Sequence, residues 1–470
     1  MLTLIIEKEI RDLVSTARFA VTFGICSLLI LLTFYVGART YALQTEQYEA
    51  ARKEQLRQLE GVTDWSSVRS ARVFLPPQPL AALVTGISND IGRNAEVRGR
   101  GEANPQDSRY AEDPIYAVFR FLDLDFLFQI LLSLFAILFG YDAVCGEKER
   151  GTLRLTFAQA VPRSTYILGK LVGSFVALGI PLLVPLLIGC AILPVLGVPL
   201  SAEEWLRLAF IVASGLLFFG VFLNCSILVS ALTHRSSNAF LAMLVVWIMA
   251  IIVVPRTAIV IAGRAVDVPT VDELASKKSR YSAQLFAEDR MAMGKFVPSN
   301  PTGPQVMQEF NKFMSKIADE RQKKMDEFSS RLNEERVNMQ RIQEDLAFGI
   351  ARISPVASLS LGLADLANSG LDLKEEFQSS IQRYQRSYGE FMVKKTGMNP
   401  GGGMIMRITD DSDREKPKPI DPSELPVFVF QPETLSASLA SALPDLGLLA
   451  ALATVLFLAA TMAFLRYDVR

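Results

Sequence analysis

The chain has 470 residues, half of them hydrophobic, and a formal net charge of −1, which gives no argument for nucleic-acid binding. Its four cysteines lie in apolar runs or beside one, so we expect no disulfide framework in the polar regions. The single histidine, His234, argues against a His-based metal site and against a His-dependent catalytic triad.

Residues 1–16 form a mixed amphipathic segment, which predicts a helix on the cytoplasmic surface. The apolar run that follows is too long for the apolar part of a signal peptide. No small-residue cleavage site follows it convincingly. We therefore interpret it as a retained membrane anchor.

Runs of about 20 apolar residues match the roughly 30 Å hydrocarbon core of a bilayer. The third run contains three prolines, which predict a kink or a partly re-entrant turn. In the fifth run, Pro255 and Arg256 predict that the crossing ends nearby, with the arginine side chain reaching the interface. In chain order, the sequence predicts six spans at 17–38, 125–144, 166–198, 207–233, 238–262 and 444–466.

Lysines and arginines in the short flanks and loops predict the orientation of the spans. They gather in the N-terminal flank, between the second and third spans, in the fourth-to-fifth turn and at the C-terminus. Both termini and the loop 145–165 are therefore expected in the cytoplasm, and segments 39–124 and 263–443 outside it. The predicted fold is an all-α membrane protein of a bacterial inner membrane, with six transmembrane helices and a mainly helical extracytoplasmic domain.

The first external segment begins with a charged helix from Thr45 to Leu59, and turn-rich sequence follows it. In the second external segment, residues 305–348 contain no Gly or Pro. Their apolar residues mostly recur at steps of three or four, which predicts one amphipathic helix about 65 Å long. Weaker patterns predict further helices near 270–292 and 372–395.

Ser354-Pro355 is a good helix start, and Asn368-Ser-Gly370 is a good stop. The helix between them is apolar enough to lie against the membrane surface or the outer mouth of the spans. Residues 401–419 predict a linker, and Val427–Phe430 predicts a short strand.

Catalytic and metal-binding motifs are largely missing from the sequence. There is no Gly-x4-Gly-Lys-Ser/Thr loop, so the chain cannot hydrolyse ATP in the usual way, and His-Glu-x-x-His and Cys-x-x-Cys are absent. We predict no bound metal and no cofactor on this chain. Asn224 lies in the middle of the fourth span, where an amide usually bonds a neighbouring helix and a role in a transport pathway is the alternative.

The charged loop after the second span is the strongest candidate site. Its candidate coupling residues are Glu147, Lys148, Glu149, Arg150, Gly151 and Thr152. The sequence after them predicts a short helix along the membrane surface, a break at Pro162, and then re-entry into the membrane. An ordinary positive-inside turn is the alternative. A helix lying along the membrane surface would give a partner protein a rigid contact site. A force applied there would tilt two spans together.

At these residues the sequence resembles the permease subunit of type-two ABC transporters. That family carries a Glu-x-Glu-x-Gly-Thr-Leu element after the second span, a Pro-x-Ser/Arg turn and a Gly-Lys start to the third span. The corresponding residues here are Glu147, Glu149, Gly151-Thr152-Leu153, Pro162-Arg163 and Gly169-Lys170. The segment from Ser354 to Gly370 is similar to a subgroup with a large extracytoplasmic domain before the last span.

This resemblance implies a non-catalytic membrane subunit of an ATP-driven exporter. Its implied partners are separate ATPase subunits that hold ATP and Mg²⁺, a second permease copy or a paralogue, and membrane lipid. In this interpretation Glu147 and Glu149 pair with basic groups on the ATPase, and Gly151 permits close backbone approach. Replacing both glutamates by lysine is then expected to uncouple or detach the ATPase while membrane insertion remains intact.

A protein of another class remains as an alternative interpretation. In it, the external helices act mechanically on an extracytoplasmic protein partner, and nothing crosses the membrane. The long external helix favours this alternative, whereas the polar Asn224 within a span favours transport.

Overall fold

The computed structural model describes residues 2–68, 70–88, 91–98, 105–106, 123–159, 161–294, 296–297, 306–396 and 419–466. The predicted linker at 401–419 lies outside these residues, except for Pro419. Within them the chain is mainly helical, and six helical runs are long and apolar enough to cross a membrane. The predicted all-α fold with six spans is therefore confirmed.

The six spanning runs differ in how they are built. Four of them are α2 (Ala17–Leu59), α8 (Arg163–Val195), α9 (Ala202–Leu232) and α16 (Leu435–Arg466). The second run joins α4 (Leu124–Phe126), a π-turn (Leu127–Leu132), α5 (Ser133–Gly140) and α6 (Cys145–Arg150). The fifth joins α10 (Ser236–Ile248), a π-turn (Met249–Val253) and α11 (Val254–Ala265).

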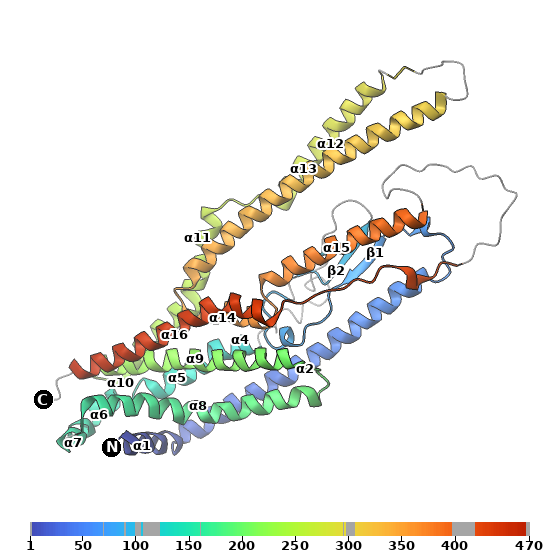
Figure 1. Cartoon of the computed structure of the whole chain (residues 1–470). Coiled ribbons are helices and arrows are strands. Elements are labelled where there is room, and N and C mark those ends of the chain that lie inside the picture. Colours follow the sequence, from blue (N-terminus) through green and yellow to red (C-terminus); the bar gives the residue numbers. More distant parts are fainter. Residues whose placement is uncertain are drawn as a thin grey trace.

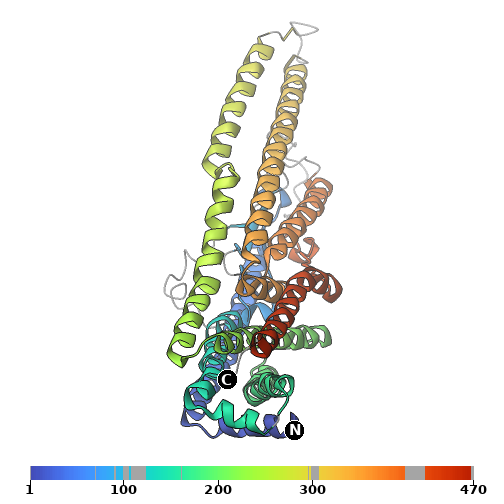
Figure 2. The ribbon, with the colours of Figure 1, turned by 90° about the vertical axis from the view of Figure 1, so that its left-hand side faces the viewer.

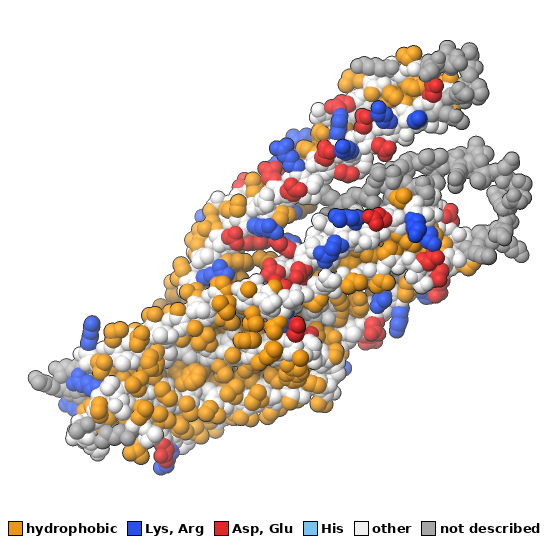
Figure 3. Space-filling view, in the orientation of Figure 1, with side chains coloured by type: hydrophobic (Ala, Val, Ile, Leu, Met, Phe, Trp, Pro, Cys, Tyr) orange, Lys and Arg blue, Asp and Glu red, His pale blue; other side chains and the backbone are white. Residues whose placement is uncertain are grey.

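The spans form a bundle, and both ends of the chain lie at one end of it, which we call the terminal end (Figure 1). The opposite end, which we call the hairpin end, carries the segments that project from the bundle. Hydrophobic side chains cover the visible face of the bundle, and charged ones gather over the projecting helices (Figure 3). This division is expected when only the bundle lies in lipid.

Prolines do not end the helix of the third span or that of the fifth. α8 is one continuous helix that contains all three of its prolines, so the third span is not re-entrant. In the fifth span the helix continues past Pro255, as far as Ala265, and the end of the membrane crossing near Arg256 stays a prediction. The π-turn directly before Pro255 contains Ile251, whose carbonyl an α-helical proline would strike, and a π-turn relieves such a clash.

A helical hairpin projects from the fifth span. α11 leads into α12 (Val271–Met293), and α13 (Val306–Ala351) returns along both (Figures 1 and 2). The 46 residues of α13 make a rod about 69 Å long, as its apolar periodicity predicts. Tyr281 stacks on Phe328 at 4.1 Å, and Arg321 pairs with Asp289, so the two arms are joined along their length.

A second projecting unit combines α15 (Leu371–Thr396) with a small antiparallel sheet. The strands are β1 (Ser70–Phe74), β2 (Asn94–Arg98) and β3 (Pro105–Gln106), in the order β1-β2-β3. The sequence predicts only turns here, so the sheet was not expected. Phe428 and Phe430 face Phe377 of α15, but their segment pairs with no described strand, so the strand predicted at 427–430 is wrong.

α14 (Pro355–Leu366) closes the hairpin end of the bundle by packing on α9 and α16. Ser354 caps it, since its hydroxyl accepts a hydrogen bond from the Val356 amide. Carboxylates crowd the corner where α14 meets α15. Burial raises the pKa of Asp365 to about 7, and neighbouring Asp372 adds to the rise. Burial likewise raises the pKa of Glu376 to about 7, helped by Glu433.

This corner makes stability depend on pH. A carboxyl group in the unfolded chain has a pKa of about 4. Between about pH 4 and pH 7 the folded form holds protons that the unfolded form has released, so the free energy of unfolding falls as the pH rises. We expect a higher thermal unfolding midpoint at pH 6 than at pH 8. Asp365→Asn should raise the midpoint at pH 8 and reduce the difference. An unchanged difference would contradict the assignment.

Candidate coupling site

The loop between the second and third spans folds into two short helices. α6 ends at Arg150, and α7 (Thr152–Ala158) begins after a single residue, Gly151. The φ of Gly151 is 72°, in the left-handed region that glycine adopts without strain. α8 then begins at Arg163, directly after Pro162. The predicted short helix and proline break are present.

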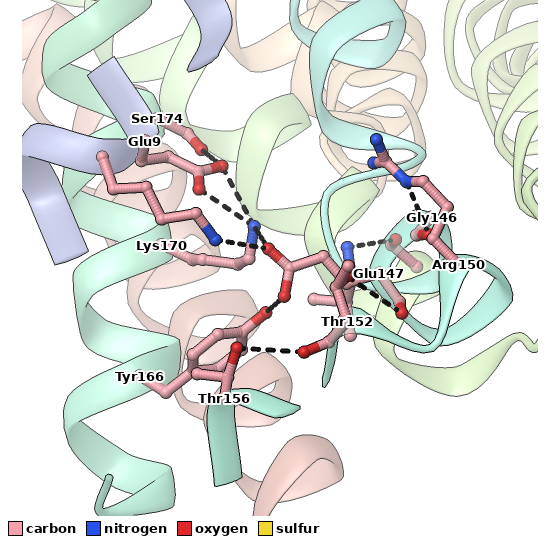
Figure 4. Close-up of polar contacts among 12 residues, drawn as sticks. Glu9, Gly146, Glu147, Arg150, Thr152, Thr156, Tyr166, Lys170 and Ser174 are labelled. Atoms are coloured by element: carbon pink, nitrogen blue, oxygen red, sulfur yellow. Dashed lines mark hydrogen bonds and ion pairs between the residues drawn. The ribbon is translucent and has the colours of Figure 1, made fainter. Parts of the chain in front are cut away.

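Glu147 turns inward and joins a buried ionic cluster, which we define as Lys8, Glu9, Glu147 and Lys170 (Figure 4). The Lys170 ammonium lies 3.2 Å from Glu147 Oε1 and 2.9 Å from Glu9 Oε2. Lys8 lies 3.5 Å from Glu147 and is half-exposed, whereas Lys170 and Glu9 are almost fully buried. Two positive and two negative charges therefore balance within the protein.

Hydrogen bonds complete the ionic cluster. The Tyr166 hydroxyl donates to Glu147 Oε2, and Ser174 donates to Glu9 Oε1 at 3.4 Å. Buried charges need such additional partners, because desolvation otherwise outweighs their attraction. The cluster joins three elements from distant parts of the sequence: α1 (Leu2–Val14), α6 and α8.

This geometry corrects the role expected for Glu147. Its carboxylate is engaged by Lys170, Lys8 and Tyr166, so it does not reach out to a partner. A lysine at position 147 would place a third positive charge beside Lys8 and Lys170. The double exchange of Glu147 and Glu149 would thus disturb the fold as well as any docking, and it cannot test coupling by itself.

The rest of α6 holds the ends of two other spans. The Glu149 carboxylate accepts bonds from the Ser236 amide and hydroxyl, at 3.1 and 2.7 Å, and so caps the first turn of α10. Lys148 donates to the carbonyls of Ala231 and Thr233, where α9 ends. Arg150 and Thr152 bond within the loop, to the carbonyls of Gly146 and Glu147 (Figure 4).

An aromatic stack joins the loop to the last span. The rings of Tyr166 and Phe464 lie 5.1 Å apart and nearly parallel, and Phe157 of α7 packs against both. Arg163 donates to the Leu465 carbonyl at 3.2 Å. Since Tyr166 also bonds Glu147, the stack and the ionic cluster form one continuous joint.

α1 reaches this joint because two glycines of α8 let it approach closely. A Cβ at Gly169 would lie 2.6 Å from Ile5 Cγ2, and one at Gly173 would lie 3.0 Å from Glu9 Cβ. Small residues spaced four apart are a common means of bringing helices together in membranes. The glycine of the predicted Gly169-Lys170 motif thus makes room for α1, and its lysine holds Glu9.

Residues 3–333 of the chain match the family described as ABC-2 family transporter protein. The chain belongs to this family. A stretch of 131 residues is 34% identical to a probable ABC transporter permease protein NosY of Stutzerimonas stutzeri, covering 27% of this chain and 46% of that protein. The chain thus spans about half the length of this curated relative.

These matches confirm the predicted type-two ABC permease. The permease is a multi-pass protein of the inner membrane, and its family indicates a non-catalytic membrane subunit. The described residues hold no group of three or more His, Cys, Asp or Glu side chains suited to a metal ion.

The loop 145–165 of the permease, which we call the coupling loop, carries α7 at its exposed surface. Leu155 is 69% exposed, whereas Leu153, two residues earlier, is buried. Gly151, Thr152 and Arg154 lie exposed around it. Leu155 lies in the predicted loop but was not among the candidate coupling residues, which were chosen from the charged and glycine-containing part of the loop. Asn224 donates to the Ala453 carbonyl at 3.2 Å and so joins α9 to α16.

Proposed function

We propose that the permease couples ATP hydrolysis by separate nucleotide-binding subunits to the export of a substrate across the inner membrane. The terminal end of the bundle would lie in the cytoplasm, as the arginines and lysines of the loops predict. ATP and Mg²⁺ would bind to the partner ATPase, and a second permease copy or a paralogue would complete the transporter.

One observation carries this proposal. The coupling loop presents an exposed surface around Leu155, while its inner side is bonded to α1, α8, α9, α10 and α16. A force applied to α7 therefore reaches several spans at once, through polar and aromatic contacts. The candidate residues Arg150, Gly151 and Thr152 are exposed, whereas Lys148 and Glu149 bond the ends of α9 and α10.

The experiment is to isolate the permease with its ATPase and to replace Leu155 by aspartate. If Leu155 is a contact of the hot-spot kind, its loss costs about 2 kcal/mol, so association should weaken about 30-fold. The matched control is Val195→Asp at the other end of α8, where the valine is 83% exposed. This control should co-isolate like the wild type. Undiminished association of Leu155→Asp would contradict docking at α7.

A second candidate function is a mechanical one, in which the external helices act on an extracytoplasmic protein without transport. The 46-residue helix α13 favours it, because most of this rod contacts neither α14 nor the spans other than α11. ATPase activity of the complex in liposomes distinguishes the two functions. Stimulation by a substrate supports export, and stimulation by an external protein alone supports the mechanical function.

A further inference from the structure

The hairpin α11–α12–α13 is attached to the same two spans that the coupling loop holds at the other end of the bundle. At the terminal end, Glu149 of α6 caps α10, and Tyr166 stacks on Phe464 of α16. These contacts fix the ends of the fifth and sixth spans to one short segment, 145–166. Relative movement of the two span ends must therefore follow movement of this segment.

At the hairpin end, the fifth span enters the hairpin directly. α10 continues through the π-turn into α11, and α13 packs along α11. Gln343 of α13 donates to the Val266 carbonyl at 2.9 Å, just after α11 ends. Ser354, at the corner beyond α13, donates to the Ala250 carbonyl within the π-turn. The C-terminal end of α13 and the corner after it, which together form the base of the hairpin, are thus bonded to the fifth span at two positions, Val266 and Ala250.

The sixth span holds the same base through an ion pair. Arg352, directly after α13, binds Asp445 of α16 with two parallel hydrogen bonds of 2.7 and 2.9 Å. The Asp445 side chain is only 1% exposed, whereas the Arg352 side chain is 40% exposed, and the two bonds to one carboxylate fix the geometry of the pair. Asp445 and Phe464 lie on the same helix, about 28 Å apart at 1.5 Å per residue, which is close to the thickness of the hydrocarbon core.

We propose that the hairpin is the output lever of the permease, driven by relative movement of the fifth and sixth spans, with the Arg352–Asp445 pair as the link that α16 pulls. The inference rests on the proposed docking of an ATPase at the coupling loop. A rod held at its base by two spans tilts when one of them shifts. A tilt of about 5° would move the far end of α13 by about 6 Å, given its length of about 69 Å.

The test measures the distance between α13 and α15 in the complete complex with its ATPase. Spin labels are attached at Glu327→Cys on α13 and Gln382→Cys on α15, both exposed positions. The native cysteines are buried or half-buried, and the unsubstituted chain measures their background labelling. Distances are recorded without nucleotide and with a non-hydrolysable ATP analogue. Glu327 lies about 36 Å from the base of α13 at 1.5 Å per residue, so a tilt of about 5° should shift the mean distance by about 3 Å in the wild type.

The decisive variant is R352Q/D445N, which replaces the ion pair by neutral amides and leaves no bare buried carboxylate. It should co-isolate with the ATPase and hydrolyse ATP, but the shift should fall below half of the wild-type value. The matched control is R341Q/E375Q, which removes another two-bond arginine–carboxylate pair of α13, one that joins it to α15. The control should keep the full shift.

Other results would overturn the inference in distinguishable ways. An equal shift in R352Q/D445N would show that α16 does not drive the hairpin, while docking of the ATPase stands. No shift in a wild-type complex that hydrolyses ATP would show that the hairpin is not the output. Failure of any ATPase to associate with the wild type would overturn the proposed function and the lever together.

Discussion

Replacing Lys170 by methionine should destabilise the permease by about 3–5 kcal/mol, which is a large part of the total stability of most proteins. The substitution leaves Glu9 and Glu147 buried in a site from which their main cation has gone. Lys8 is half-exposed and lies 3.5 Å from Glu147, so it cannot replace the contacts of 2.9 and 3.2 Å that Lys170 makes with Glu9. The thermal unfolding midpoint in detergent measures the loss.

A triple variant separates the charge effect from packing. Adding Glu9→Gln and Glu147→Gln to Lys170→Met removes the unpaired carboxylates, and most of the lost stability should return, because replacing a whole buried ion pair is often nearly neutral. A Lys170→Met protein that is as stable as the wild type would show that the ionic cluster does not hold α1, α6 and α8 together.

Introducing alanine at both Gly169 and Gly173 should release α1 from α8. The new methyl groups would lie 2.6 Å from the Ile5 side chain and 3.3 Å from the Ile6 Cα, which is part of the backbone and cannot turn away. Overpacking of this kind costs about 1–3 kcal/mol, and the gain in helix propensity returns at most about 1 kcal/mol per glycine. When α1 moves, Glu9 withdraws from Lys170, so the ionic cluster breaks as well.

Hydrogen exchange of the α1 amides measures this release, and we expect it to accelerate at least tenfold in the double variant, as a loss of about 1.4 kcal/mol requires. Gly179→Ala is the matched control, since it lies on the same helix and its Cβ would meet only Phe175, at an ordinary 3.9 Å. Unchanged exchange in the double variant would mean that the two glycines do not determine how closely α1 docks.

The spans, the long hairpin helix and the capped α14 could be predicted from the sequence because their signals are local. Twenty apolar residues identify a span wherever it packs, and Ser354 caps a helix whatever surrounds it. The course of the helix through Pro255 could not be predicted, because the sequence does not show that a π-turn before the proline keeps the helix intact. The sheet was missed because β1 and β2 are only five residues each and pair across a long loop.

The coupling loop was located correctly in the sequence, but the directions of its side chains were not. Glu147 and Glu149 are two positions apart, so they face different sides of α6, and nothing local shows which one is buried. Glu9 and Lys170 are 161 positions apart, and only the folded chain brings them together. The sequence nonetheless indicates that Lys170 is paired in the folded chain, because it stands within an apolar run, where a charge needs a partner.

The ionic cluster also imposes an order on biosynthesis. Chains are made from the N-terminus, so the acids Glu9 and Glu147 both emerge before Lys170, their shared base. α1 therefore has no cation of α8 to hold it until the third span has entered the membrane. Phe464, which completes the aromatic stack, comes almost 300 residues later. An ATPase that recognises the finished joint would engage only those permeases whose last span is already in place.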